Sequence, residues 1–119
     1  MKKDNSHQNL EVWNLAKLLV KNTYQYTSKF PKHEMFGLTN QLRRASVSIC
    51  ANIAEGKGRD SQNEFKYFLR IARGSTIEVM SHLEIATMLG FLNAEDYKYL
   101  FELADRVSAM LYKLSNNLR

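Results

Sequence analysis

The sequence contains one cysteine, one proline and five glycines among 119 residues. The single cysteine, Cys50, cannot form an intramolecular disulfide or a thiolate metal cluster, whereas a small secreted protein usually has several cysteines. The scarcity of proline and glycine leaves little material for the turns that a fold of many short strands requires. These low counts favour a fold of long helices and a protein that resides in a reducing compartment.

Long apolar runs are also lacking. No stretch of 20 apolar residues occurs, and residues 1–9 are polar, without the apolar segment of a signal peptide. We therefore expect a cytoplasmic protein with no membrane association. A chain of 119 residues needs only one hydrophobic core, so we expect a single domain over residues 1–119.

Positive charge is unevenly distributed along the chain. The formal net charge is +5, but residues 1–74 contain 13 Lys and Arg against 6 Asp and Glu, whereas residues 75–119 contain 4 against 6. The first part of the chain is therefore basic and the second weakly acidic.

Apolar residues recur at spacings of three and four in four segments, which predicts helices over about 8–28, 35–55, 61–89 and 94–118. Two residue pairs have the spacing of N-terminal helix caps, Ser61 with Glu64 and Asn93 with Asp96. Gly90 could end the third helix by adopting a left-handed backbone conformation. The expected core face of the first helix consists of Leu10, Trp13, Ala16, Val20 and Tyr24.

Short connections between these segments predict an all-α fold, an antiparallel up-down-up-down four-helix bundle. An irregular array of the same helices is the alternative.

The second predicted helix has ten consecutive uncharged residues, from Ala45 to Ala54. A helix that is apolar or small on every side is usually buried on every side, and three neighbouring helices cannot surround it. We therefore expect a second subunit to cover the positions outside the core stripe. The alternative is that these small residues are simply exposed to solvent, as single small apolar residues often are. These candidate interface residues are Val47, Cys50, Ala51 and Ala54.

Several short stretches together resemble the S23 family of four-helix bundles, the 23S rRNA-intervening sequence proteins. They are Leu10-Glu11-Val12-Trp13, Phe30-Pro31, Gln41-Leu42-Arg43-Arg44-Ala45, Asn52-Ile53-Ala54-Glu55-Gly56 and Ala72-Arg73-Gly74-Ser75. The resemblance implies an antiparallel bundle that assembles into a homopentamer. It also implies kinship with the accessory proteins of diversity-generating retroelements, which form basic pentameric barrels beside a reverse transcriptase. It implies no known activity.

Three cations, Lys66, Arg70 and Arg73, follow one another at i, i+4 and i+7, so they form one stripe on the third predicted helix. No carboxylate lies three or four residues from any of them. Such a stripe could bind a polyanion such as RNA, DNA or a ribonucleoprotein, since basic side chains neutralise phosphates and release counterions. The candidate nucleic-acid-binding residues are Arg43, Arg44, Arg59, Lys66, Arg70 and Arg73.

The same cations could instead serve the fold or face solvent. Glu55 and Glu78 lie in largely uncharged surroundings and could form structural ion pairs with Arg43, Arg44 or Arg73. The remaining three cations could simply form a solvated face.

Candidate catalytic and metal-binding patterns are weak. None of the three histidines follows a glutamate by three residues, as a di-iron bundle requires, and no phosphate loop or nucleophile elbow occurs. We expect no catalytic residues, metal, cofactor or small-molecule substrate. The sequence thus predicts a non-enzymatic homo-oligomer that acts as an adaptor for nucleic acid or a ribonucleoprotein. The alternative is an oligomeric scaffold for a protein partner.

Overall fold

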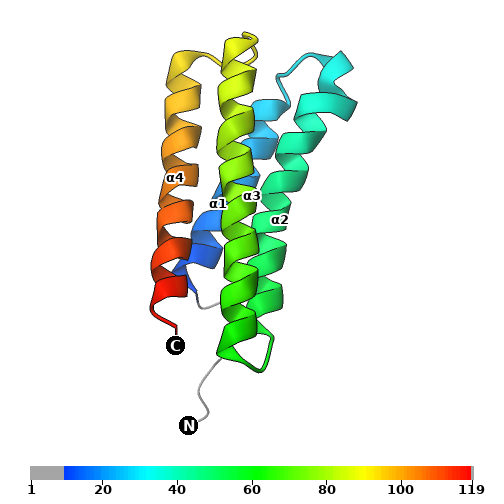
Figure 1. Cartoon of the computed structure of the whole chain (residues 1–119). Helices are drawn as coiled ribbons and strands as arrows, with labels where there is room; N and C mark the ends of the chain where they lie inside the picture. Colours follow the sequence, from blue (N-terminus) through cyan, green and yellow to red (C-terminus); the bar gives the residue numbers. More distant parts are fainter. Residues whose placement is uncertain (1–9, 119) are drawn as a thin grey trace.

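The computed structural model describes residues 10–118, which form four α-helices (Figure 1). They are α1 (Glu11–Thr27), α2 (Asn40–Lys57), α3 (Gln62–Met88) and α4 (Ala94–Asn116). A 3-10 turn, η2 (Lys32–Glu34), and a π-helical turn, η3 (Met35–Thr39), lie between α1 and α2. Residues 8 and 9, which we expected to begin the first helix, lie outside the described residues.

The helices alternate in direction along the chain, so the predicted all-α antiparallel bundle is confirmed (Figure 1). Each helix packs against two neighbours, α1 against α2 and α4, and α3 against α2 and α4, which closes a square around one core. The most deeply buried large side chains come from all four helices and are Leu19, Leu42, Ile49, Ile53, Leu69, Leu83, Leu100 and Leu111.

Helices α3 and α4 begin within a residue or two of the predicted positions, because local caps fix both starts. The Ser61 hydroxyl accepts a hydrogen bond from the Glu64 amide at 3.0 Å, and the Asn93 side chain accepts one from the Asp96 amide at 2.7 Å. The predicted stop after α3 is also confirmed, since Gly90 has a φ of 84°.

The core face of α1 differs from the predicted stripe. Val12, Ala16 and Leu19 are buried, whereas Tyr24, which we expected in the core, is 41% exposed. Apolar residues occur on two adjacent sides of this helix, so spacing alone did not distinguish the side that meets α2 and α4.

The second predicted helix begins five residues too early. Gly37 has φ −112° and ψ −116°, which is not helical, and the chain bends there before α2 starts at Asn40. The apolar stripe from Leu38 to Ile53 is nevertheless buried as predicted. The bend leaves Phe36 94% exposed.

Two glycines differ in what they do for helix packing. Helix α2 continues through Gly56 to Lys57. A Cβ on Gly56 would lie 2.7 Å from the Phe68 Cβ, so this glycine permits the close approach of α2 and α3. At Gly74 of α3, by contrast, a Cβ would have nothing within 4 Å. Within residues 10–118, bundle packing therefore does not require a glycine at Gly74.

Candidate nucleic-acid interface

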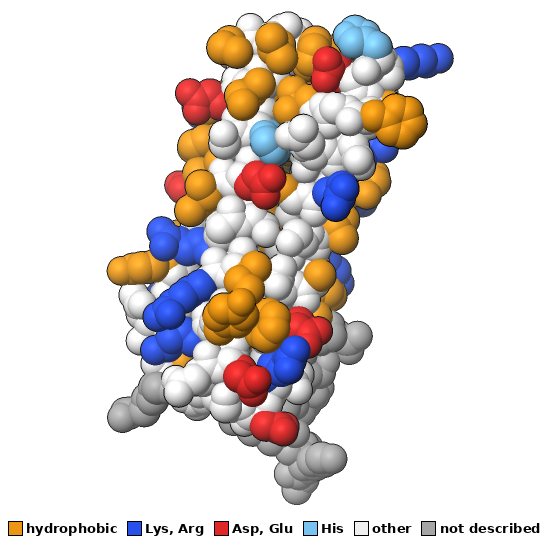
Figure 2. Space-filling model, turned by 45° about the vertical axis from the view of Figure 1, so that its right-hand side comes forward, with side chains coloured by type: hydrophobic (Ala, Val, Ile, Leu, Met, Phe, Trp, Pro, Cys, Tyr) orange, Lys and Arg blue, Asp and Glu red, His pale blue; other side chains and the backbone are white. Residues whose placement is uncertain are grey.

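The basic stripe occupies the first half of α3. Lys66 is half-buried and Arg70 is exposed, and neither has an ion-pair or hydrogen-bond partner within residues 10–118. Figure 2 shows Lys and Arg side chains gathered over the lower left of the molecule, beside a patch of hydrophobic side chains. The two cations therefore present uncompensated charge to solvent.

Arg73, the third member of the stripe, reaches across to α4. Its guanidinium lies 4.7 Å from the centroid of the Tyr112 ring, and its Nε donates a hydrogen bond to the Ser108 hydroxyl at 3.3 Å. Both contacts fix the side chain without neutralising it, because neither partner is a carboxylate.

Arg43 makes the corresponding contacts on another side of the bundle, between α2 and α1. Its guanidinium lies 4.6 Å from the centroid of the Tyr24 ring, and its Nε donates to the Thr27 hydroxyl at 3.0 Å. Tyrosines and hydroxyls thus take the place of the glutamate partners that we considered for Arg43 and Arg73.

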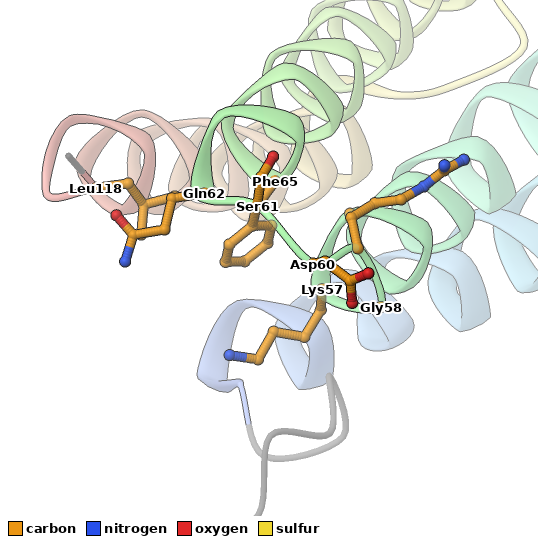
Figure 3. A pocket seen from close by; sticks show the side chains of 9 residues that line it. Lys57, Gly58, Asp60, Ser61, Gln62, Phe65 and Leu118 are labelled. Carbon is orange, nitrogen blue, oxygen red and sulfur yellow. The ribbon is translucent and has the colours of Figure 1, made fainter.

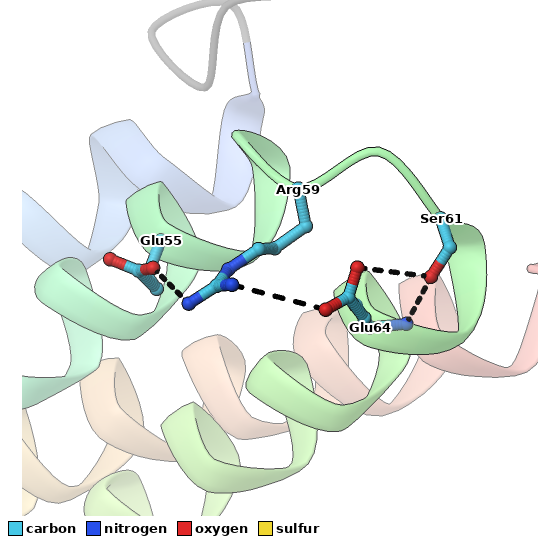
Figure 4. A network of polar contacts seen from close by, with 4 residues as sticks. All are labelled: Glu55, Arg59, Ser61 and Glu64. Atoms are coloured by element: carbon cyan, nitrogen blue, oxygen red, sulfur yellow. Dashed lines mark hydrogen bonds and ion pairs between the residues drawn. The ribbon is translucent and has the colours of Figure 1, made fainter.

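Arg59 is the cation that carboxylates do neutralise (Figure 4). Its guanidinium is 2.5 Å from a Glu55 oxygen and 3.9 Å from a Glu64 oxygen, and the three side chains are each about half exposed. Glu55 therefore pairs with Arg59 at the surface, and not with Arg43, Arg44 or Arg73, the partners that we considered. Two carboxylates beside one guanidinium leave a local charge that does not favour phosphate.

Glu78 lies beside His82, with 3.5 Å between a carboxylate oxygen and Nε2. Glu78 and Arg44 both line a groove of about 480 Å³ between α2 and α3, together with Phe36, Asn40, Gln41 and Ser48. Among the described residues, neither Arg43, Arg44 nor Arg73 forms an ion pair with Glu78.

The candidate interface residues on α2 divide into two groups. Val47 and Ala51 are exposed and Ala54 is half-buried, so they lie on the outer side of the helix. Cys50, by contrast, is only 9% exposed and belongs to the core of its own bundle. Burial raises the pKa of the Cys50 thiol to about 11, although the charge of Lys17 acts in the opposite direction.

Two exposed tyrosines beside the stripe are absent from the site residues predicted from the sequence. Tyr67 is 58% exposed and Tyr112 is 53% exposed, whereas Trp13 and Tyr26 are partly buried against the core. Helical spacing could have placed Tyr67 next to Lys66 and Arg70. Only the packing of α3 against α4 brings Tyr112 to the same surface.

A hollow of about 520 Å³ lies where α2 turns into α3 (Figure 3). Leu118 and Gln62 border it on one side and Lys57 and Asp60 on the other. Residues 10–118 contain no cluster of three or more potential metal ligands. None of the helices in this range combines the length and hydropathy that crossing a membrane demands.

Comparison with known proteins finds similarity over most of the chain. A family model described as 23S rRNA-intervening sequence protein matches residues 8–113. The fold is similar to the crystal structure of a protein of unknown function from the S23 ribosomal protein family of Bacteroides thetaiotaomicron VPI-5482. The TM-score is 0.78 at 21% identity, and the match covers 87% of this chain and 97% of that one. No curated protein matches the sequence.

Proposed function

The chain belongs to the 23S rRNA-intervening sequence protein family, and we propose that it is a non-enzymatic homo-oligomer that binds polynucleotide through the basic stripe of α3. In this role it is an adaptor for nucleic acid or for a ribonucleoprotein in the cytoplasm. The family name refers to 23S rRNA, so RNA is the first polynucleotide to test.

The observation that carries this proposal is the uncompensated charge of Lys66 and Arg70. Like charges one helical turn apart destabilise a helix by about 0.2–0.5 kcal/mol, and no carboxylate within residues 10–118 offsets this cost. Phosphates would offset it, and the release of their counterions would provide affinity without base-specific contacts.

Three of the six candidate residues, Lys66, Arg70 and Arg73, form the proposed interface. Arg59 is excluded because Glu55 and Glu64 already neutralise it. Arg43 is held against α1, away from the stripe, and Arg44 lies over the groove between α2 and α3.

Self-assembly is the second part of the proposal. The outer side of α2 offers Val47, Ala51 and Ala54 to a neighbouring subunit, with no charged side chain from Ala45 to Ala54 to keep it in water. A closed ring, with five subunits as the expected number, would repeat the stripe once per subunit. Several weak patches on one rigid particle can then engage a single polyanion together.

A scaffold for a protein partner is the alternative function, and one observation favours it. Phe36 is 94% exposed at the bend before α2 and borders the groove that contains Arg44 and Glu78. Exposed aromatic side chains next to a groove are typical anchors of protein interfaces.

Charge reversal in the stripe tests the proposal. The double variant Lys66→Glu, Arg70→Glu should bind fluorescent mixed-sequence RNA or DNA at least tenfold more weakly than the unaltered chain at about 50 mM salt, by fluorescence anisotropy. The control Lys21→Glu, Lys32→Glu alters net charge equally at exposed positions on α1 and η2. An equal loss of affinity in the two variants, or no binding by the unaltered chain, would favour the alternative function as a scaffold for a protein partner.

A further inference from the structure

Two exposed tyrosines flank the basic stripe on opposite sides. Arg73 contacts α4, and Ser75 contacts Ser48 of α2 through a hydrogen bond of 3.0 Å, which orients α3 between its neighbours. At 100° per residue, Lys66 lies about 20° from Arg73 on the α4 side, Arg70 lies about 40° further out, and Tyr67 lies beyond Arg70 and faces outward. Tyr112 of α4 lies beside Arg73, at the other edge of the stripe. Cations thus lie between two aromatic rings.

Each ring is held by its own neighbours while much of its surface stays open. The Arg73 guanidinium stacks against Tyr112, which is still 53% exposed. Tyr67 meets Phe68 in an edge-to-face arrangement with centroids 5.2 Å apart, and it is 58% exposed. Rings fixed in this way lose little side-chain entropy when a ligand stacks on them.

Gly74 provides an opening on the same surface. It lies four residues after Arg70 and seven after Tyr67, so the three share one side of α3. A glycine within a helix costs about 1 kcal/mol relative to alanine, and no atom of residues 10–118 would contact a Cβ there. Bare backbone beside an aromatic ring allows a flat group to approach closely.

From this geometry we propose that the preferred ligand is single-stranded polynucleotide, whose bases stack on Tyr67 and Tyr112 while its phosphates contact Lys66 and Arg70. The inference rests on the proposed function and specifies its ligand. Bases in a duplex already stack on one another, so a duplex can offer only phosphates to this surface. An unpaired strand can offer both phosphates and base faces, a combination that is typical of single-strand binding.

Removing the rings without removing charge tests this inference. The double variant Tyr67→Leu, Tyr112→Leu should bind an unstructured strand of about 20 nucleotides at least tenfold more weakly, which equals about 1.4 kcal/mol. Its affinity for a duplex of the same sequence should change by less than about twofold, because every cation remains. Tyr24→Leu is the matched control, since Tyr24 is 41% exposed and stacks on Arg43 in the same manner.

A strand of equal length with abasic sites provides the second measurement. The unaltered chain should prefer the strand that carries bases, and the double tyrosine variant should not distinguish the two strands. If the unaltered chain binds duplex, abasic and intact strands equally, the inference fails although the proposed function stands.

Failure of the proposed function has a different signature, because no polynucleotide would then bind at any salt concentration and both proposals would fall. If the tyrosine variant instead dissociates the oligomer in light scattering, the rings belong to a contact between copies of the chain, and the inference is overturned.

Discussion

Arg43 and Arg73 retain their positive charge because they meet tyrosine rings and hydroxyl groups. A guanidinium stacked on an aromatic ring at 4.6 or 4.7 Å is fixed in position by dispersion and by the ring quadrupole. A carboxylate would fix it equally well but would cancel its charge. The charge of Arg59 is cancelled in this way by the carboxylates of Glu55 and Glu64. Arginines of one small bundle therefore differ in their suitability for binding phosphate.

The Cys50 thiol gives a test of burial at the residue scale. Its pKa of about 11, compared with an ordinary value of 9.0, means about 100-fold less thiolate at pH 8 than in the unfolded chain. Alkylation by iodoacetamide should be slower in the native protein by at least this factor, as measured by mass spectrometry with and without urea. A native rate equal to the unfolded rate would show that the thiol is exposed.

The same pKa shift has a defined sign for stability. Folding favours the neutral thiol, so its contribution is fully present below pH 9 and is lost as the pH rises towards about 11. The free energy of unfolding should fall over this range more in the unaltered chain than in Cys50→Ala.

At the scale of the element, α2 and α3 approach each other closely where α2 ends. Gly56 is buried, and a Cβ there would lie 2.7 Å from the Phe68 Cβ and 3.3 Å from the Phe65 carbonyl oxygen. The backbone oxygen cannot move without shifting α3. Helix packing at this point therefore depends on the absence of one methyl group.

Alanine substitutions at Gly56 of α2 and Gly74 of α3 test whether the packing of the two helices depends on Gly56. Gly56→Ala should destabilise the bundle by about 1–3 kcal/mol, because the added methyl group overpacks the contact with α3. Gly74→Ala should stabilise it by up to about 1 kcal/mol, because the methyl group meets open space. Urea unfolding at a fixed protein concentration measures both changes. Similar destabilisation by the two substitutions would contradict the assignment of the close approach to Gly56.

Local signals predicted the elements well where a cap or a stop specified them. Ser61, Asn93 and Gly90 act within one helical turn of their own positions, so their effect can be read without tertiary structure. The bend at Gly37 is also accompanied by a local contact, since the Glu34 carboxylate accepts a hydrogen bond from the Leu38 amide at 3.1 Å, but the spacing of apolar residues did not reveal it. The close approach of Gly56 to α3 could not be read from local sequence, because Phe65 and Phe68 lie on another helix. The i, i+4, i+7 stripe was predictable for the same reason as the caps. The partners of Arg43 and Arg73 were not, because they lie on other helices.

At the scale of the whole molecule, the charged and uncharged surfaces separate by helix. The stripe of Lys66, Arg70 and Arg73 lies on α3, whereas the uncharged outer residues Val47 and Ala51 lie on α2. A ring that buries the α2 surface can therefore leave the α3 stripe free in every subunit. Assembly and polynucleotide binding would then be separable by mutation.

Ala51→Arg should weaken assembly, because a charge would be buried between subunits on the outer side of α2. The matched control is Ala109→Arg, the same substitution at an exposed alanine of α4. Light scattering at micromolar concentration should show a smaller particle for the first variant only. Equal masses for the two variants, or a stable monomer in the unaltered chain, would refute the proposed contact.

The salt dependence of polynucleotide binding tests self-assembly and polynucleotide binding in one measurement. A single stripe of three cations would give a slope of log Kobs against log salt of about −2 on single-stranded nucleic acid. Several stripes on one ring should give a slope steeper than about −4, and the Ala51→Arg variant should return it to about −2. Binding that is absent at about 50 mM salt, or that does not weaken as salt rises, would contradict the proposal that repeated stripes of Lys66, Arg70 and Arg73 hold a polyanion.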